Sequence, residues 1–145
     1  MNTIGILGGM GSYATVDIFR RIVDAFPAEK EWERPHIIID NNCTMPSRVR
    51  AILYDENKDI LVKEMRKSIE RLVSGGATKI IIGCITAHHF VTELPHVDKI
   101  VNAVAETVRY IPKGDVLILC TEGTAQVGIW DEVLDNCKVI YPDDD

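Results

Sequence analysis

The sequence lacks a hydrophobic run that is long enough to cross a membrane. A spanning helix needs roughly 18 or more apolar residues in a row, and the first apolar stretch is already interrupted at Gly5, Gly8 and Gly9. The same stretch has no positively charged leader and no small-residue cleavage site, which are the marks of a secretory signal. These absences favour a cytoplasmic protein with no membrane partner.

Clustered positive charge is also missing. Lys and Arg number 16 against 22 Asp and Glu, which gives a formal net charge of -6, and no basic run exceeds a pair such as Arg20-Arg21. Proteins that bind a nucleic-acid backbone usually present a basic patch or stripe. The sequence therefore predicts no nucleic-acid partner.

Closely paired cysteines are absent as well. The four cysteines, at positions 43, 84, 120 and 137, form no Cys-x-x-Cys motif, so reduced thiols are expected without a secretory context. A disulfide between Cys43 and Cys84 is an alternative, because both follow predicted strands. A metal site made by Cys84, His88 and His89 is another alternative, but its spacing matches no standard zinc arrangement. We expect no metal.

What the sequence does contain is an alternation of apolar strands and amphipathic helices. With 145 residues, of which 46% are hydrophobic and 26% charged, it can build a substantial core. Periodicity predicts strands at 3–7, 36–40, 78–82, 116–119 and 138–141, and helices near 18–26, 60–73, 101–110 and 127–134. This order predicts an α/β fold, Rossmann-like or flavodoxin-like, in which helices cover both faces of a parallel sheet. The break at Pro112-Lys113-Gly114 divides it into a first domain, 1–112, and the beginning of a second, 113–145.

The first strand-to-helix turn has two interpretations. Residues Gly9 to Ala14 fit the G-x-G-x-x-A dinucleotide fingerprint, and Asp40 ends the second strand, where a ribose-binding acid is expected. However, Asp40 follows Gly9 by 31 residues, whereas about 20 is usual. A tight turn without a nucleotide, either unliganded or binding a carboxylate, is therefore favoured.

Cys84 is the strongest candidate for chemistry. It follows the apolar strand Ile80-Ile81-Ile82 and Gly83, so its thiol should stand at the carboxyl end of the sheet, where α/β proteins place their sites. Following amides and the positive end of a helix would favour a thiolate. An inert, buried cysteine is the alternative. Arg48, in the polar loop after the second strand, could bind a carboxylate in a bidentate fork or simply pair within its own loop.

Four motifs in the same order resemble the aspartate/glutamate racemase family. They are Gly5-Ile6-Leu7-Gly8-Gly9-Met10-Gly11, Asn41-Asn42 with Pro46-Ser47-Arg48, Cys84-Ile85-Thr86-Ala87-His88, and Thr121-Glu122-Gly123-Thr124. The match covers essentially the whole chain but only the first part of the family's usual length. It implies two similar α/β domains with the active site between them, and a cofactor-independent racemase that uses two cysteines on an amino-acid substrate. Exposed strand edges and half-covered sheet faces favour partners, so we also expect a homodimer or other homo-oligomer.

The resemblance also implies the site residues. Cys84 matches the first catalytic cysteine, which exchanges a proton with the substrate Cα while a second group acts on the opposite face. Donors around the carboxylate would counter the charge of the carbanion. The implied substrate-binding residues are Met10, Gly11, Asn42, Arg48, Thr86, His88 and Thr124.

Two departures from the family pattern matter. Ile85 stands where the family usually has an asparagine that holds the substrate. The family's second cysteine lies further along than residue 145, and neither Cys120 nor Cys137 occupies its place. We therefore keep two alternatives: a fragment of an active enzyme, and a shortened relative that binds an amino acid without turnover.

Overall fold

The computed structural model describes residues 3–142 and contains a four-stranded parallel sheet with the strand order β2-β1-β3-β4. The strands are β1 (Ile4–Gly8), β2 (Ile37–Asn41), β3 (Lys79–Ile82) and β4 (Ile100–Val101). Runs of three isoleucines form most of β2 and β3, because β-branched side chains pack well on a pleated surface. The predicted α/β fold is confirmed, with the strand order of flavodoxin-like proteins.

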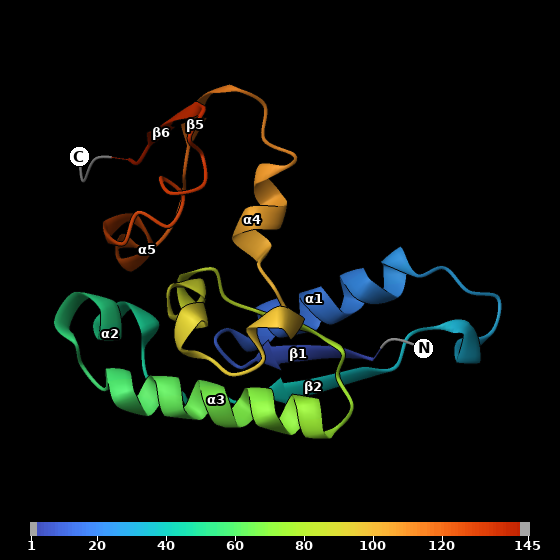
Figure 1. The fold of residues 1–145 in the computed structure, drawn as a ribbon. Coiled ribbons are helices and arrows are strands. Elements are labelled where there is room, and N and C mark those ends of the chain that lie inside the picture. The colour runs from blue at the N-terminus through green and yellow to red at the C-terminus, as the bar shows by residue number, and fades with distance from the viewer. Residues whose placement is uncertain (1–2, 143–145) are drawn as a thin grey trace.

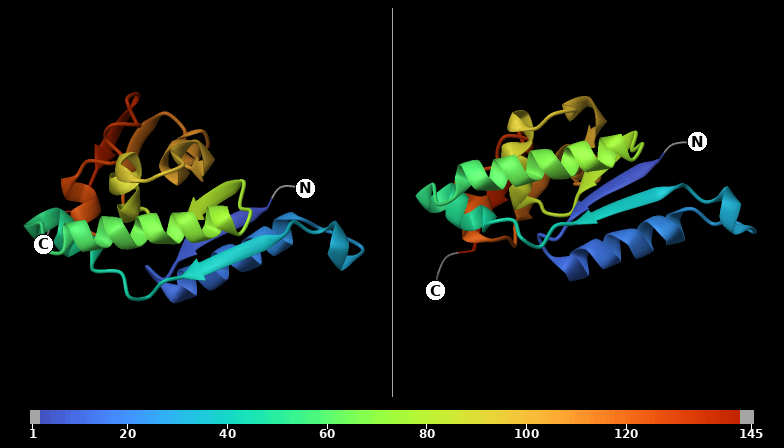
Figure 2. Two further views of the ribbon diagram at one scale, coloured as in Figure 1. Left: turned by 60° about the horizontal axis from the view of Figure 1, so that its bottom comes forward. Right: turned by 90° about the horizontal axis from the view of Figure 1, so that it is seen from below.

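Helices cover both faces of this sheet (Figures 1 and 2). On one face, Leu7 and Ile80 pack in a core cluster with α3 (Lys58–Ser74). Ile6 is fully buried yet lies outside that cluster, because successive side chains of a strand point to opposite faces. Because both α1 (Ser12–Ala25) and α3 contact β1, this strand is enclosed from both sides.

A smaller lobe stands beyond the sheet, above α2 (Arg48–Tyr54) and α3 in Figure 1. It contains two parallel strands and two short helices, which pack around a second core cluster centred on Val104, Trp130 and Leu134. The elements are α4 (Ala103–Val108), β5 (Gly114–Leu117), α5 (Glu122–Gln126) and β6 (Cys137–Ile140). Because Val104 belongs to this cluster, α4 packs with the smaller lobe although it precedes the predicted break at residue 112.

Several local predictions were wrong or incomplete. Residues 127–134 form turns instead of a helix, because Gly128 adopts a left-handed conformation with φ 61°. Trp130 and Leu134 are both buried. A single turn between them keeps the spacing of a helix, because the Leu134 N–H donates to the Trp130 carbonyl. Helix α5, with Thr121 as its N-cap, was not predicted. The other elements not predicted are η1 (Glu31–Glu33), α2 (Arg48–Tyr54), η2 (Thr86–Glu93), η3 (Val97–Lys99) and β4.

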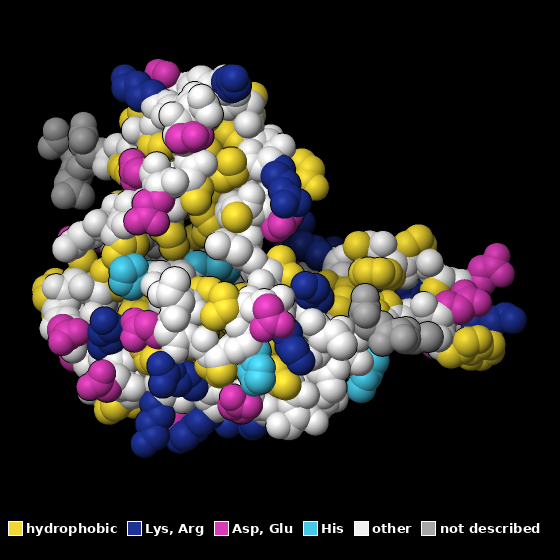
Figure 3. All heavy atoms as spheres, viewed as in Figure 1, with side chains coloured by type: hydrophobic (Ala, Val, Ile, Leu, Met, Phe, Trp, Pro, Cys, Tyr) yellow, Lys and Arg dark blue, Asp and Glu magenta, His cyan; other side chains and the backbone are white. Residues whose placement is uncertain are grey.

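The surface shown in Figure 3 carries both signs of charge. Lys and Arg side chains gather along the edge over α3 and are interleaved with Asp and Glu. Within residues 3–142, no helix is both long and apolar enough to cross a membrane, and no three His, Cys, Asp or Glu side chains gather closely enough to hold a metal ion.

The smaller lobe contacts the rest of the protein where α5 lies against α2. A Cβ placed on Gly123 would stand 3.2 Å from the Cα of Val49, a separation that is tighter than almost all real contacts of this kind. Gly123 is itself buried. The absence of a side chain at this position therefore allows the two helices to approach.

We expect Gly123→Ala to lower the free energy of unfolding by about 1–2 kcal/mol, because the added methyl forces α5 away from α2. At an unconstrained helical position the same change would stabilise the protein by roughly 0.5–1 kcal/mol. Denaturation followed by tryptophan fluorescence tests this, since Trp130 is buried in the smaller lobe and Trp32 is exposed. A variant more stable than the wild type would contradict the close contact.

Candidate active site

Three loops meet at one edge of the sheet. Parallel pairing aligns Gly8 of β1 with Asn41 of β2, and Leu7 of β1 with Ile82 of β3. The loops after these strands therefore leave the sheet side by side. Open α/β sheets bind ligands outside the carboxyl ends of their strands, where the strand order reverses, and here that point lies between β1 and β3.

The glycines of the first loop allow two close approaches. A Cβ on Gly8 would lie 2.4 Å from the Thr15 hydroxyl, and a Cβ on Gly9, which has φ 83°, would lie 2.3 Å from the Asn42 carbonyl carbon. Protein atoms thus fill the space beside both glycines. Asp40, the other part of the dinucleotide pattern, is paired with Arg71 at 2.7 Å. Close packing accounts for the glycines without a nucleotide.

The next two residues of this loop keep their amides open. Within residues 3–142, the N–H groups of Met10 and Gly11 have no hydrogen-bond acceptor in the protein. Helix α1 begins directly after them, with Gly11 as its N-cap, no side-chain cap and no acidic residue in its first turn. Free amides at the positive end of a helix attract anions. This arrangement fits the carboxylate contact predicted for Met10 and Gly11.

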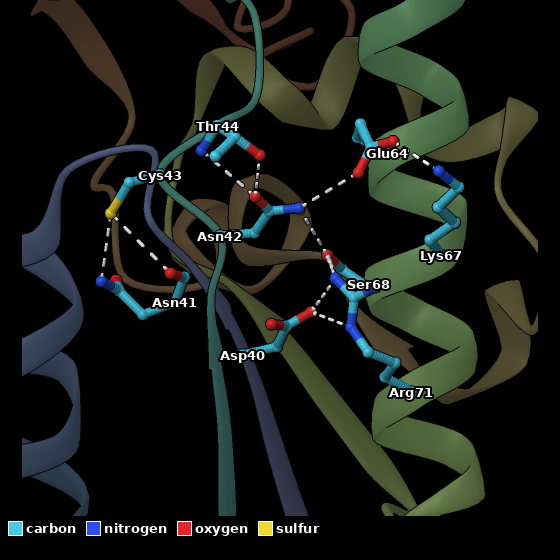
Figure 4. A network of polar contacts seen from close by, with 9 residues as sticks. All are labelled: Asp40, Asn41, Asn42, Cys43, Thr44, Glu64, Lys67, Ser68 and Arg71. Carbon is cyan, nitrogen blue, oxygen red and sulfur yellow. Dashed lines mark hydrogen bonds and ion pairs between the residues drawn. The ribbon is translucent and has the colours of Figure 1, made fainter.

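Asn42 uses its side chain to hold the second loop (Figure 4). Its Oδ1 accepts hydrogen bonds from the Thr44 amide at 3.2 Å and from the Thr44 hydroxyl at 2.7 Å. Its Nδ2 points toward α3 and lies 3.5 Å from both Glu64 and Ser68. The predicted substrate-binding amide is therefore occupied by protein groups on both sides.

Arg48 connects the first and second loops. Its Nη1 donates to the Pro46 carbonyl at 3.0 Å and its Nη2 to the Met10 carbonyl at 3.3 Å, while its buried Nε has no partner. In the described part of the chain, no carboxylate forms an ion pair with this guanidinium. The guanidinium is therefore bonded to two carbonyl oxygens and has no carboxylate partner among the described residues.

Cys84 follows β3 and is supported by His88 through the backbone. The thiol is partly exposed, at the border of the main core cluster. The His88 Nδ1 donates to the Cys84 carbonyl at 2.9 Å, and the Nε2 accepts the Ala103 amide at 3.2 Å. Both ring nitrogens are occupied by backbone groups. Burial lowers the pKa of His88 from its ordinary value, so the neutral ring that these two partners require is favoured.

Three threonine hydroxyls join the smaller lobe to the Cys84 loop. Thr86 and Thr124 are buried with their hydroxyls 2.7 Å apart, and Thr121 lies 3.1 Å from Thr124. The fold thus brings together two of the predicted carboxylate anchors, which already bond to each other. Beside them is a cavity of about 340 Å³, lined also by Ile85 and Cys120. Partial burial raises the pKa of the Cys120 thiol.

The remaining cysteines do not support the disulfide alternative. All four cysteines are free, and the strands preceding Cys43 and Cys84 are separated by β1. Cys43 instead contacts the Ser12 hydroxyl and the Asn41 amide, each at 3.2 Å. Sequence reasoning missed Thr15, whose hydroxyl contacts the first loop. A threonine four residues after Gly11 was the available signal.

Comparisons with known proteins agree with this architecture. A family model described as Asp/Glu/Hydantoin racemase matches residues 7–142. The structure is similar to the Picrophilus torridus aspartate racemase, with 26% identity, a TM-score of 0.88, and coverage of 99% of this chain and 63% of that one. An aspartate racemase homologue from Pyrococcus horikoshii OT3 shares the fold at 21% identity and a TM-score of 0.72, with coverage of 99% and 66%. The chain therefore spans slightly less than two thirds of the length of either structure.

The buried imidazole predicts a pH dependence of stability. Because the pKa of His88 is lowered on folding, the unfolded chain takes up the proton first as the pH falls below about 6.5. The stabilisation is complete above that value and is lost toward the lower pKa of the folded state. Urea denaturation between about pH 7 and pH 5 should show a smaller loss of stability for His88→Gln than for the wild type. Equal losses would show that His88 titrates alike in both states.

Proposed function

We propose, from the premise that the chain belongs to the Asp/Glu/hydantoin racemase family, that it acts in cofactor-independent racemisation of an amino acid of the aspartate or glutamate type. The observation that carries this proposal is the juxtaposition of loops at one sheet edge. The loop of Cys84, the open amides of Met10 and Gly11, and the unpaired guanidinium of Arg48 all belong to that edge.

The proposed reaction begins with proton transfer. The Cys84 sulfur accepts the proton from the substrate Cα, and the electron pair left behind spreads into the adjacent carboxylate. Thiols suit this step because their ordinary pKa, near about 8.5, is close enough to neutrality for both protonation states to be accessible. Return of a proton to the same face gives exchange with solvent. Formation of the other enantiomer requires a second acid, distinct from Cys84, that delivers a proton to the opposite face.

The carboxylate needs groups that favour its increased negative charge. The amides of Met10 and Gly11 are suited to this role, since α1 begins beside them and no protein acceptor in the described chain uses their protons. Arg48 adds a full positive charge that is anchored on two carbonyl oxygens. Donors that are oriented before the reaction stabilise developing charge without a cost of reorganisation.

The other predicted binding residues fit supporting roles better. Asn42 and His88 hold the second loop and the Cys84 loop through bonds to protein groups. Thr86 and Thr124 bond to each other across the two lobes. In our proposal these four residues fix the site's shape, and the direct contacts to substrate come from Cys84, Met10, Gly11 and Arg48.

A second candidate function is amino-acid binding without turnover. The observation that favours it is Ile85, which directly follows Cys84 and packs with the apolar cluster of the smaller lobe, contributing no polar group. Calorimetry with the enantiomers of aspartate and glutamate measures binding, and chiral analysis of the same mixtures measures turnover. Binding without isomerisation or Cα exchange would favour this second function.

We expect Cys84→Ser to reduce deuterium exchange at the substrate Cα by at least about a hundredfold, because a serine hydroxyl is a far weaker acid than a thiol and is essentially un-ionised near neutral pH, so it is a poor proton acceptor there. Mass spectrometry of each amino-acid enantiomer after incubation in heavy water provides the measurement. Cys137→Ser is the matched control, since Cys137 lies at the start of β6 in the second core cluster. Undiminished exchange in the Cys84 variant would exclude it from the mechanism.

Replacing Arg48 by lysine should weaken binding of the carboxylate substrate about tenfold, because lysine retains the charge but loses the planar set of donors. Arg50→Lys makes the same change on the exposed side of α2, where Arg50 pairs with Glu56. Calorimetric titration with aspartate compares the dissociation constants. Similar losses of affinity in both variants would exclude a specific role for the donor geometry of Arg48.

A further inference from the structure

Thr15 fills the space behind the first loop. It lies on α1 with 3% of its surface exposed, and its side chain occupies the volume that a Cβ on Gly8 would need. A buried hydroxyl costs free energy unless it forms hydrogen bonds. The hydrogen-bond partners of the Thr15 hydroxyl are therefore the groups whose positions it stabilises.

The Thr15 hydroxyl spans the loop from one end to the other. It accepts the Gly9 amide at 3.2 Å and donates to the Gly11 carbonyl at 3.0 Å. The two bonded peptide groups lie on either side of Met10, whose amide and that of Gly11 remain free. The Thr15 hydroxyl thus bonds to the Gly9 N–H and the Gly11 carbonyl, and it leaves the N–H groups of Met10 and Gly11 without a protein partner.

This bridge adds to the contacts that the loop makes with Asn42 and Arg48, and it acts on residues that are otherwise costly to order. Gly9 and Gly11 have φ values of 83° and 147°, and glycine loses more conformational freedom on ordering than any other residue. The Met10 carbonyl, between the two bonded groups, is also the acceptor for Arg48. Fixing the loop therefore fixes the orientation of the Met10 and Gly11 amides and, through the Met10 carbonyl, the position of the Arg48 guanidinium.

We propose that Thr15 is a positioning residue of the carboxylate site, whose hydroxyl holds the Met10 and Gly11 amides and Arg48 in the geometry that binds the substrate. This role rests on the proposed function. It is a role of the hydroxyl and not of the side-chain volume, so the two properties can be separated by substitution.

Two variants make that separation. Thr15→Val keeps the branched shape and removes both hydrogen bonds, whereas Thr15→Ser keeps the hydroxyl and removes a methyl group beside Gly8. We expect Thr15→Val to raise KM for aspartate, and Kd measured by calorimetry, about tenfold, with a fall in kcat/KM. Thr15→Ser should bind and react within about twofold of the wild type, even where its Tm falls through the lost packing.

Thr107→Val is the matched control. Thr107 is exposed on α4 and its hydroxyl bonds to a carbonyl four residues earlier, as that of Thr15 does, but outside the site. It should leave KM and Kd unchanged. A purely structural role for Thr15 would lower kcat in proportion to the folded fraction without changing KM.

The outcomes separate the two proposals. A wild type that binds aspartate without racemisation or exchange overturns the proposed function, while the Kd of the Thr15 variants still decides the positioning role. An active wild type with unchanged KM and Kd in Thr15→Val overturns the positioning role alone. A wild type that neither binds nor turns over any enantiomer of aspartate or glutamate overturns both.

Discussion

The close approach of the backbone after β1 to the backbone after β2 is the constraint on which the candidate site depends. Without a side chain at Gly9, the first loop can lie directly against Asn42. This contact places the Met10 carbonyl within reach of Arg48 at 3.3 Å. Any larger residue at position 9 would separate the two loops, and the amides and the guanidinium would no longer share one edge of the sheet.

The electrostatics of this edge follow from how its polar groups are paired. Toward α3, charges compensate each other: Asp40 pairs with Arg71, and Glu64 with Lys67 (Figure 4). Toward β3, His88 is kept neutral by burial. Arg48 is instead bonded only to carbonyl oxygens. A protein with a formal net charge of -6 thus presents a local positive centre, as binding of a carboxylate requires.

The sequence was sufficient for features that depend on local pattern and insufficient for those that depend on distant partners. Short apolar runs identified β1, β2 and β3, and the glycine after β3 indicated that Cys84 follows the strand end. Asn42 and His88 were identified by their motifs, but their contacts to Thr44, α3 and Ala103 depend on tertiary packing. The turns at 127–134 were missed because Trp130 and Leu134 are spaced as in a helix, while Gly128 ends regular structure.

The Cys84 loop is held from the smaller lobe as well as from the sheet. His88 joins the Cys84 carbonyl to the first turn of α4, and Thr86 bonds to Thr124 of α5. Both links involve buried groups, for which loss of a hydrogen-bond partner is costly. Movement of the smaller lobe would therefore shift the residues on either side of the thiol. This coupling lets packing far from the sheet determine where Cys84 stands relative to the loop after β1, which is anchored independently through α1.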